Sequence, residues 1–141
     1  MLKTKLLHPE IWSALGSNGH GAKVLIADGN FPVTTAVPVT AKKVFLNFAP
    51  DMLSVTDILK VLATCIPIES VTVMVPPDES EQAIHLEFTE ILGTYVPMKK
   101  LKRFDFYEEA KSPDTCLAIA SGETRRFANI LLTVGVVKKA E

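Results

Sequence analysis

Three short segments of the sequence hold polar side chains that could do chemistry. His20 lies between two glycines, and Asp28 comes directly after a short apolar run. Arg103 and Tyr107 are four residues apart, and Asn129 directly precedes a second apolar stretch. Together these five residue types suit reversible proton transfer on a ligand rich in hydroxyl groups better than they suit hydrolysis.

The sequence lacks the common motifs for phosphate, nucleotide or zinc chemistry. The patterns G-x-x-x-x-G-K-[ST], G-x-G-x-x-G, G-x-S-x-G and H-E-x-x-H are all absent. Cys65 and Cys116 lie far apart in apolar segments, so we expect buried, reduced thiols. His8 and His85 have no partners at ligand spacing, and we expect both at the surface. We therefore expect neither a metal nor a cofactor.

His20 and Asp28 flank one predicted strand, which would separate them by up to ~25 Å when fully extended. They can meet if the glycine-flanked loop folds back over the sheet, because glycine tolerates positive φ, or if a neighbouring subunit supplies one of them. Two simpler interpretations stay open. His20 could be an ordinary loop residue, and Asp28 could begin a turn at D-G-N.

The elements that must position these residues alternate between helices and apolar strands. We expect helices at 8–17, from a Ser54 cap to about residue 66, and after residue 81, with a helical turn at 106–111. We expect strands at 23–28, 42–48, 70–75, 100–103, 115–120 and 129–136. This order predicts an α/β fold over 1–141, a single domain with a largely parallel central sheet between helical layers. Ligands of such sheets bind beyond the carboxyl ends of the strands, where Asp28 is expected.

Composition narrows the class of protein further. Of the 141 residues, 48% are hydrophobic, which is more than one small core can readily bury. This composition favours an oligomer, because an interface between subunits would bury the remaining apolar side chains. The net charge of −1 provides no general attraction to nucleic acid or to anionic membranes. Apolar stretches are too short to span a bilayer, and the first residues lack the apolar core of a signal peptide. We therefore expect a cytoplasmic protein.

Four segments together resemble the bacterial ribose pyranase / fucose mutarotase family. They are GHG around residue 20, DGNFP at 28–32, RFDFYEEA at 103–110 and SGETRRFANILLTVGV at 121–136. Their order and separation fit the family, whereas residues 45–95 match only in the rhythm of helices and strands. The resemblance implies a cofactor-independent mutarotase that interconverts the anomers of L-fucose or a related monosaccharide. It also implies pockets formed between the subunits of a ring-like homo-oligomer, with a decamer as the expected assembly.

The resemblance assigns roles to the residues at both ends of the chain. The histidine that matches His20 is the acid/base, and the aspartate that matches Asp28 binds sugar hydroxyls. The residues that match Phe127, Ala128 and Asn129 contact the ligand, in part through the main chain. A pocket between subunits would also bring His20 to an Asp28 that is not its own.

Three further positions concern the choice of sugar. Arg103 matches a sugar-contacting arginine of the fucose branch. Tyr107 matches a tyrosine of that branch where the pyranase branch has histidine, and it is our candidate for a second proton carrier. Phe127 departs from the family, which usually has tyrosine there, so a hydroxyl group is missing. Two alternatives stay open: a non-catalytic sugar-binding or transport-associated module of the same fold, and a ring-forming scaffold without a sugar ligand.

Overall fold

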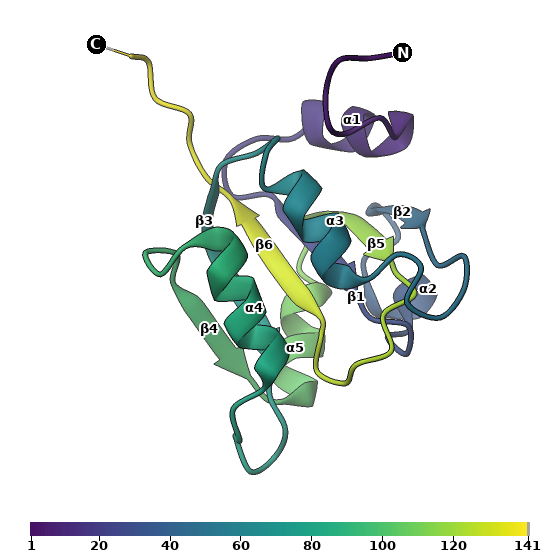
Figure 1. Cartoon of the computed structure of the whole chain (residues 1–141), viewed down its shortest axis with the longest axis vertical. Coiled ribbons are helices and arrows are strands. Elements are labelled where there is room, and N and C mark those ends of the chain that lie inside the picture. The colour runs from purple at the N-terminus through teal and green to yellow at the C-terminus, as the bar shows by residue number, and fades with distance from the viewer. Residues whose placement is uncertain (141) are drawn as a thin grey trace.

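The centre of the computed structural model, which describes residues 1–140, is a six-stranded sheet. Its strands are β1 (Lys23–Ala27), β2 (Lys42–Phe45), β3 (Ile68–Met74), β4 (Met98–Leu101), β5 (Thr115–Ala120) and β6 (Ile130–Val134). They lie in the order β2-β5-β1-β6-β3-β4 (Figure 1). β6 runs antiparallel to β1 and β3, whereas the remaining neighbours pair in parallel. The predicted largely parallel sheet is confirmed, with β6 as its reversed strand.

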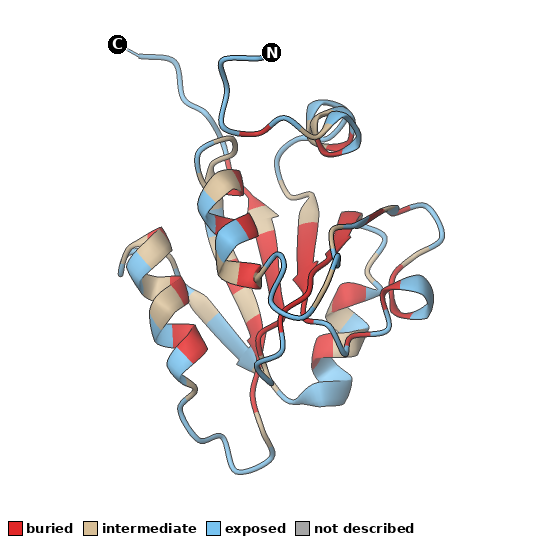
Figure 2. Ribbon diagram, turned by 45° about the vertical axis from the view of Figure 1, so that its right-hand side comes forward, coloured by how far each residue is buried: buried red, intermediate tan, exposed pale blue. Residues whose placement is uncertain are grey.

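Helices cover both faces of this sheet, as the sequence predicted. They are α1 (Pro9–Gly16), α2 (Val33–Ala36), α3 (Val55–Leu62), α4 (Ala83–Leu92) and α5 (Arg103–Ala110). The apolar side chains of α1, α3 and α4 share one core, and those of α2 and α5 share the other. Successive residues of β1 alternate between the two cores, because side chains of a strand point to opposite faces. Figure 2 shows the buried residues concentrated along the strands and on the inward sides of the helices. Among residues 1–140, no helix has the length and apolar character that crossing a membrane would require.

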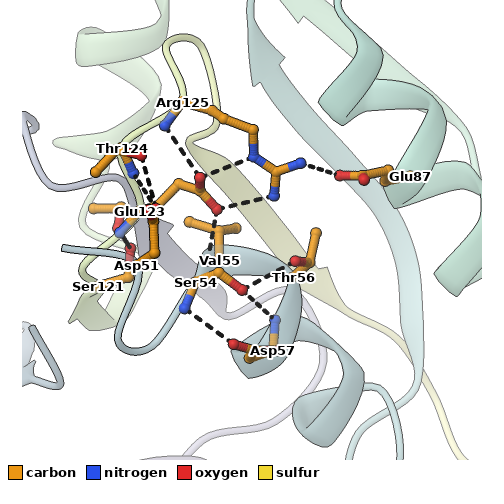
Figure 3. Close-up of polar contacts among 11 residues, drawn as sticks. Asp51, Ser54, Val55, Thr56, Asp57, Glu87, Ser121, Glu123, Thr124 and Arg125 are labelled. Carbon is orange, nitrogen blue, oxygen red and sulfur yellow. Dashed lines mark hydrogen bonds and ion pairs between the residues drawn. The ribbon is translucent and has the colours of Figure 1, made fainter.

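The predicted cap of the second long helix is present at the start of α3. Ser54 Oγ accepts a hydrogen bond from the Asp57 backbone N–H at 3.1 Å. In return, Asp57 Oδ2 accepts from the Ser54 N–H at 3.2 Å (Figure 3). This reciprocal pair satisfies backbone donors that a helix start otherwise leaves free.

One prediction about local structure needs correction, and two features were not predicted. The short helix α2 was not predicted from the sequence. The strand expected at 100–103 spans Met98–Leu101, so Arg103 begins α5 and does not end a strand. β5 and β6 are separated by β1, so residues 121–129 form a loop that passes the end of β1. This loop lets β6 enter the middle of the sheet, where both of its apolar faces are covered.

Candidate functional site

A cavity of about 220 Å³ opens at the carboxyl edge of the parallel strands. It is lined by Asp28, Asn30, Phe31, Met74, Arg103, Tyr107, Arg126, Phe127 and Asn129. These residues come from the ends of β1 and β3, from α5, and from the segment that leads into β6. Because β6 is antiparallel, its first residues lie at the edge where its neighbours end. The topology therefore gathers at one place residues that are distant in the sequence, such as Asp28 and Asn129, which are 101 positions apart.

Asp28 is buried at the end of β1 and organises the turn that follows it. Its Oδ1 accepts hydrogen bonds from the backbone N–H groups of Asn30 at 2.9 Å and Phe31 at 3.0 Å. The Asx turn that the sequence left open is therefore present, at a residue that also lines the cavity. Burial raises the pKa of the Asp28 carboxyl, although hydrogen bonds from the backbone of Asn30, Phe31 and Ala128 oppose that rise.

Asn129 is buried beside Asp28 and is oriented by it. The Asp28 backbone N–H donates to Asn129 Oδ1 at 2.7 Å. Because an N–H donor requires an oxygen acceptor, this bond fixes the orientation of the Asn129 side-chain amide. The NH₂ group of Asn129 therefore remains available to donate to a ligand. Both residues line the same cavity. Ala128 is fully buried between Phe127 and Asn129 and does not line the cavity with its side chain.

Arg103 and Tyr107 reach the cavity from one side of α5. Their spacing of four residues places them on the same helix face, as neighbours one turn apart. The Tyr107 ring packs edge-on against Phe31, with 5.2 Å between ring centroids. Arg103 is exposed, so its guanidinium is free to adapt to a hydroxyl-rich ligand. The sequence predicted both residues for the site, and the structure brings both to the cavity.

The segment that carries Phe127 and Asn129 is anchored by the buried carboxylate of Glu123, which is 1% exposed. Glu123 accepts hydrogen bonds from Arg125 Nε at 2.9 Å and from the backbone N–H of Val55, the first residue of α3, at 3.2 Å. Arg125 also pairs with Glu87 of α4 (Figure 3). Burial alone would raise the pKa of Glu123, but the hydrogen bonds from Arg125 outweigh it and hold the pKa below its ordinary value.

Phe127 has an unusual backbone, and a second buried residue holds it. Its φ of 57° lies in the left-handed region, which is uncommon for residues other than glycine. His85 Nε2 lies 2.9 Å from the Phe127 carbonyl oxygen, to which the protonated nitrogen donates. The Arg126 guanidinium lies 5.3 Å from the centroid of the Phe127 ring. This backbone arrangement fixes one wall of the cavity.

His85 was predicted at the surface, and that prediction was wrong. It is buried in α4 and stacks on Phe88, with 6.0 Å between ring centroids. Burial lowers the pKa of His85, the Phe127 carbonyl partly opposes that effect, and Lys100 adds to it. The apolar stripe of α4 was visible in the sequence, but a histidine within it gave no signal that it would bond to a distant carbonyl.

His20 lies at the other edge of the sheet, before β1. It is exposed, and its Nε2 lies 3.0 Å from Oε2 of Glu69, near the start of β3. The full length of β1 separates it from Asp28, so the loop does not fold back over the sheet. Of the two routes that the sequence left open for bringing His20 to an Asp28, the one within a single chain is excluded.

The remaining predictions about ligating groups concern cysteine and metals. Cys65 and Cys116 are free thiols, but both are only half-buried, because they lie at the margin of the core. Burial raises the pKa of the Cys116 thiol. In the described part of the chain, no group of three or more His, Cys, Asp or Glu side chains could hold a metal ion.

Known proteins resemble this chain over nearly its whole length. It is similar to the fucose mutarotase of Homo sapiens, at 29% identity over 94% of this chain and 90% of that protein. It is similar to the fucose mutarotase of Danio rerio, at 30% identity over 96% of this chain and 93% of that protein. The structure of Bacillus subtilis RbsD complexed with D-ribose superposes with a TM-score of 0.84 at 25% identity, covering 98% of this chain and 100% of that one. A family model matches residues 1–137, and the chain therefore belongs to the RbsD / FucU transport protein family.

Proposed function

We propose that this protein is a cofactor-independent mutarotase that interconverts the anomers of L-fucose or a related monosaccharide. The observation that carries the proposal is the cavity of about 220 Å³, in which Asp28, Arg103 and Asn129 converge. Its volume lies below the ~300–1,000 Å³ of sites for drug-sized ligands, which suits a single sugar ring. Relatives named fucose mutarotase, at about 30% identity over most of the chain, support the same activity.

The reaction opens a cyclic hemiacetal and closes it on the other face of the carbonyl. A base removes the proton of the anomeric hydroxyl, the bond between the anomeric carbon and the ring oxygen breaks, and an acid protonates the ring oxygen. After the carbonyl has turned, the same steps run in reverse. Only C–O and O–H bonds change, so two proton carriers are sufficient and no redox or group-transfer partner is required.

The residues of the cavity would bind and orient the sugar. Asp28 accepts hydrogen bonds from hydroxyl groups, whereas the Arg103 guanidinium and the Asn129 amide donate them. Phe31 and Phe127 offer apolar surface to the carbon face of the ring. Holding the sugar against the proton carriers in this way converts proton transfer into a step within one complex.

Proton transfer would use His20 and Tyr107. Imidazole side chains commonly act as general acids and bases in enzymes, so His20 is suited to take and return a proton. Tyr107 lines the cavity, and we propose it as the second carrier. Since His20 is remote from its own cavity, we propose that it serves the cavity of a neighbouring subunit.

This arrangement requires the protein to assemble with itself, and we propose a ring-like homo-oligomer with ten subunits. Large apolar side chains are exposed around β2, an edge strand of the sheet: Phe45, Phe48, Met52 and Leu53. Exposed apolar side chains that gather in this way commonly mark a surface for contact with another protein chain. We further propose a cytoplasmic location, in which the free thiols of Cys65 and Cys116 would stay reduced.

Saturation-transfer NMR tests the activity directly. With L-fucose, D-ribose and related sugars, we expect magnetisation to pass between the α and β signals faster with the protein than without it. The experiment needs no added metal or nucleotide. Binding of a sugar without faster exchange would favour the non-catalytic binding or transport module, and the mutarotase proposal would be wrong.

Mixing two inactive variants tests the shared site. His20→Ala removes the acid/base, and Asp28→Asn removes the sugar-binding charge while keeping an oxygen for the Asx turn. If each site uses His20 of one subunit and Asp28 of another, random reassembly of an equal mixture makes about one site in four intact. We expect activity to return on mixing. A mixture as inactive as its components would contradict a site shared between subunits.

A further inference from the structure

Two guanidinium groups line the proposed sugar cavity, and the fold supplies neither with a carboxylate. Arg103 and Arg126 both lie in the wall of the cavity of about 220 Å³. Among residues 1–140, neither of them forms an ion pair. Asp28 contributes the one carboxylate among the lining residues that the structure describes. The wall of the cavity therefore carries more positive than negative charge.

The neighbouring Arg125 shows how a structural arginine is used in this segment. It donates to the buried carboxylate of Glu123 at 2.9 Å and pairs with Glu87 of α4 (Figure 3). Its guanidinium is thus occupied within the fold. Arg126 follows directly in the chain, yet it is exposed and lines the cavity instead. Because the fold pairs one arginine and leaves the next one unpaired, the charge of Arg126 is available to a ligand.

The ring of Phe127 holds the Arg126 guanidinium at the cavity wall. The guanidinium carbon lies over this ring, 5.3 Å from its centroid. A guanidinium in this position contacts the ring through its face, so the N–H donors at its edge stay free. The backbone that carries the ring is held in turn by His85, whose Nε2 lies 2.9 Å from the Phe127 carbonyl oxygen. Arg126 is therefore oriented before a ligand arrives, which lowers the entropic cost of binding.

We infer that Arg103 and Arg126 bind the carboxylate of an acidic monosaccharide, a hexuronate. A guanidinium matches a planar carboxylate with two parallel N–H···O bonds, and such charged bonds are about twice as strong as those between neutral groups. A hexuronate has its carboxylate at carbon 6, where L-fucose has a methyl group, and keeps the ring and the anomeric hydroxyl. Asp28 then binds hydroxyl groups, because two carboxylates would repel each other.

The inference rests on the proposed function and names the substrate class of the same cavity. The reaction is unchanged, since carbon 6 takes no part in opening or closing the hemiacetal. The same C–O and O–H bonds break and form, and the carboxylate serves only to bind and orient the sugar.

D-galacturonate and the methyl ester of its carboxyl group form a matched pair of probes. The ester removes the negative charge and keeps nearly the same shape. Calorimetry measures Kd for both, and exchange NMR measures kcat/KM. We expect the native protein to prefer galacturonate over the ester by about tenfold or more in both quantities. Added salt should reduce the preference, because both guanidinium groups are exposed.

Arg103→Gln and Arg126→Gln remove one positive charge each from the cavity wall. We expect each substitution to reduce the preference for galacturonate by about tenfold and to leave the Kd of the neutral ester little changed. Both side chains are exposed, so the fold should tolerate their loss. Lys102→Gln is the matched control: it makes the same change of charge at an exposed residue next to Arg103 that does not line the cavity, and the preference should persist.

Equal Kd values for galacturonate and its ester in the native protein would overturn the inference, and so would a preference that both glutamine variants retain. Tighter binding of galactose 6-phosphate than of galacturonate would replace the carboxylate by a phosphate and overturn it as well. The failure of the proposed function would look different. Charge-dependent binding of galacturonate without faster exchange would support the ligand class and refute the mutarotase, whereas faster exchange of neutral sugars alone would do the reverse.

Discussion

The two edges of the sheet hold different halves of the proposed chemistry, and they are built differently. At the carboxyl edge, Asp28 and Asn129 are buried and bonded to each other, and Glu123 anchors the segment beside them. At the amino edge, His20 is exposed and contacts one exposed partner, Glu69. The cavity residues, Tyr107 among them, come from one chain, whereas His20 faces outward from the opposite edge.

This difference separates stability from activity. Residues of the carboxyl edge satisfy buried backbone groups, so their loss should weaken the fold as well as the site. His20 and Glu69 at the amino edge are exposed and bond to no buried backbone group, so their loss should affect only the reaction. The strength of this separation can be measured with one variant at each edge.

His20→Ala should have the largest effect on rate and almost none on stability. Loss of an acid/base group lowers a rate by about 10²-fold or more. Because the ring is exposed, no core cavity is created, and the free energy of unfolding should change by less than ~0.5 kcal/mol. Exchange NMR and urea denaturation measure the two quantities, with light scattering to check assembly. A rate that falls only in proportion to lost stability would identify His20 as a structural residue.

Glu123→Ala should show the opposite behaviour. The substitution leaves the buried N–H of Val55 without its acceptor, which should lower the free energy of unfolding by about 2 kcal/mol. Glu87→Ala is the control, because Glu87 binds the exposed end of the same arginine and should cost less than ~0.5 kcal/mol. Equal effects of the two substitutions in urea denaturation would show that the network is a surface feature.

The sequence predicted the fold well because its apolar runs carry most of the information. The buried strands and the amphipathic α3 and α4 follow from hydrophobic periodicity, and Ser54 with Asp57 marks the start of α3. The position of β6 in the middle of the sheet was not predictable, because periodicity says nothing about strand order. α2 was missed since four residues are too few to show a helical period.

The polar residues of the site were predictable only in part. Asp28 was found from its place after a strand, and Asn129 from its place before one. The contacts of Glu69 with His20 and of His85 with the Phe127 carbonyl were not predicted, because each joins residues more than 40 positions apart. Such contacts are set by strand order, which leaves no local pattern.

His85→Gln should change how stability depends on pH at the carboxyl edge. Because burial lowers the pKa of His85, the folded chain resists the proton that the unfolded chain takes up below its ordinary pKa of 6.5. The native protein therefore has its full stability above the ordinary pKa of histidine. It loses stability as pH falls toward the lowered pKa that His85 has in the folded chain.

Glutamine can still donate to the Phe127 carbonyl but cannot titrate. We expect the native protein to lose stability between about pH 7.5 and 5.5 relative to His85→Gln, as measured by urea denaturation across that range. If the free energy of unfolding of the two proteins changed with pH in parallel, His85 would not be the source of the pH dependence.

Phe127→Tyr should have the smallest effect, and it introduces the tyrosine that the family resemblance leads us to expect at this position. The half-buried ring lines the cavity near Asp28 and Asn129, so the added hydroxyl can bind the sugar without displacing the core. One additional hydrogen bond is worth about 0.5–1.5 kcal/mol, which corresponds to a gain of about two- to tenfold in kcat/KM. Phe127→Leu is the control, because it removes the ring and should lower kcat/KM. If tyrosine gives the native rate while leucine is slower, the ring alone contributes at this position, and Tyr107 remains the second proton carrier.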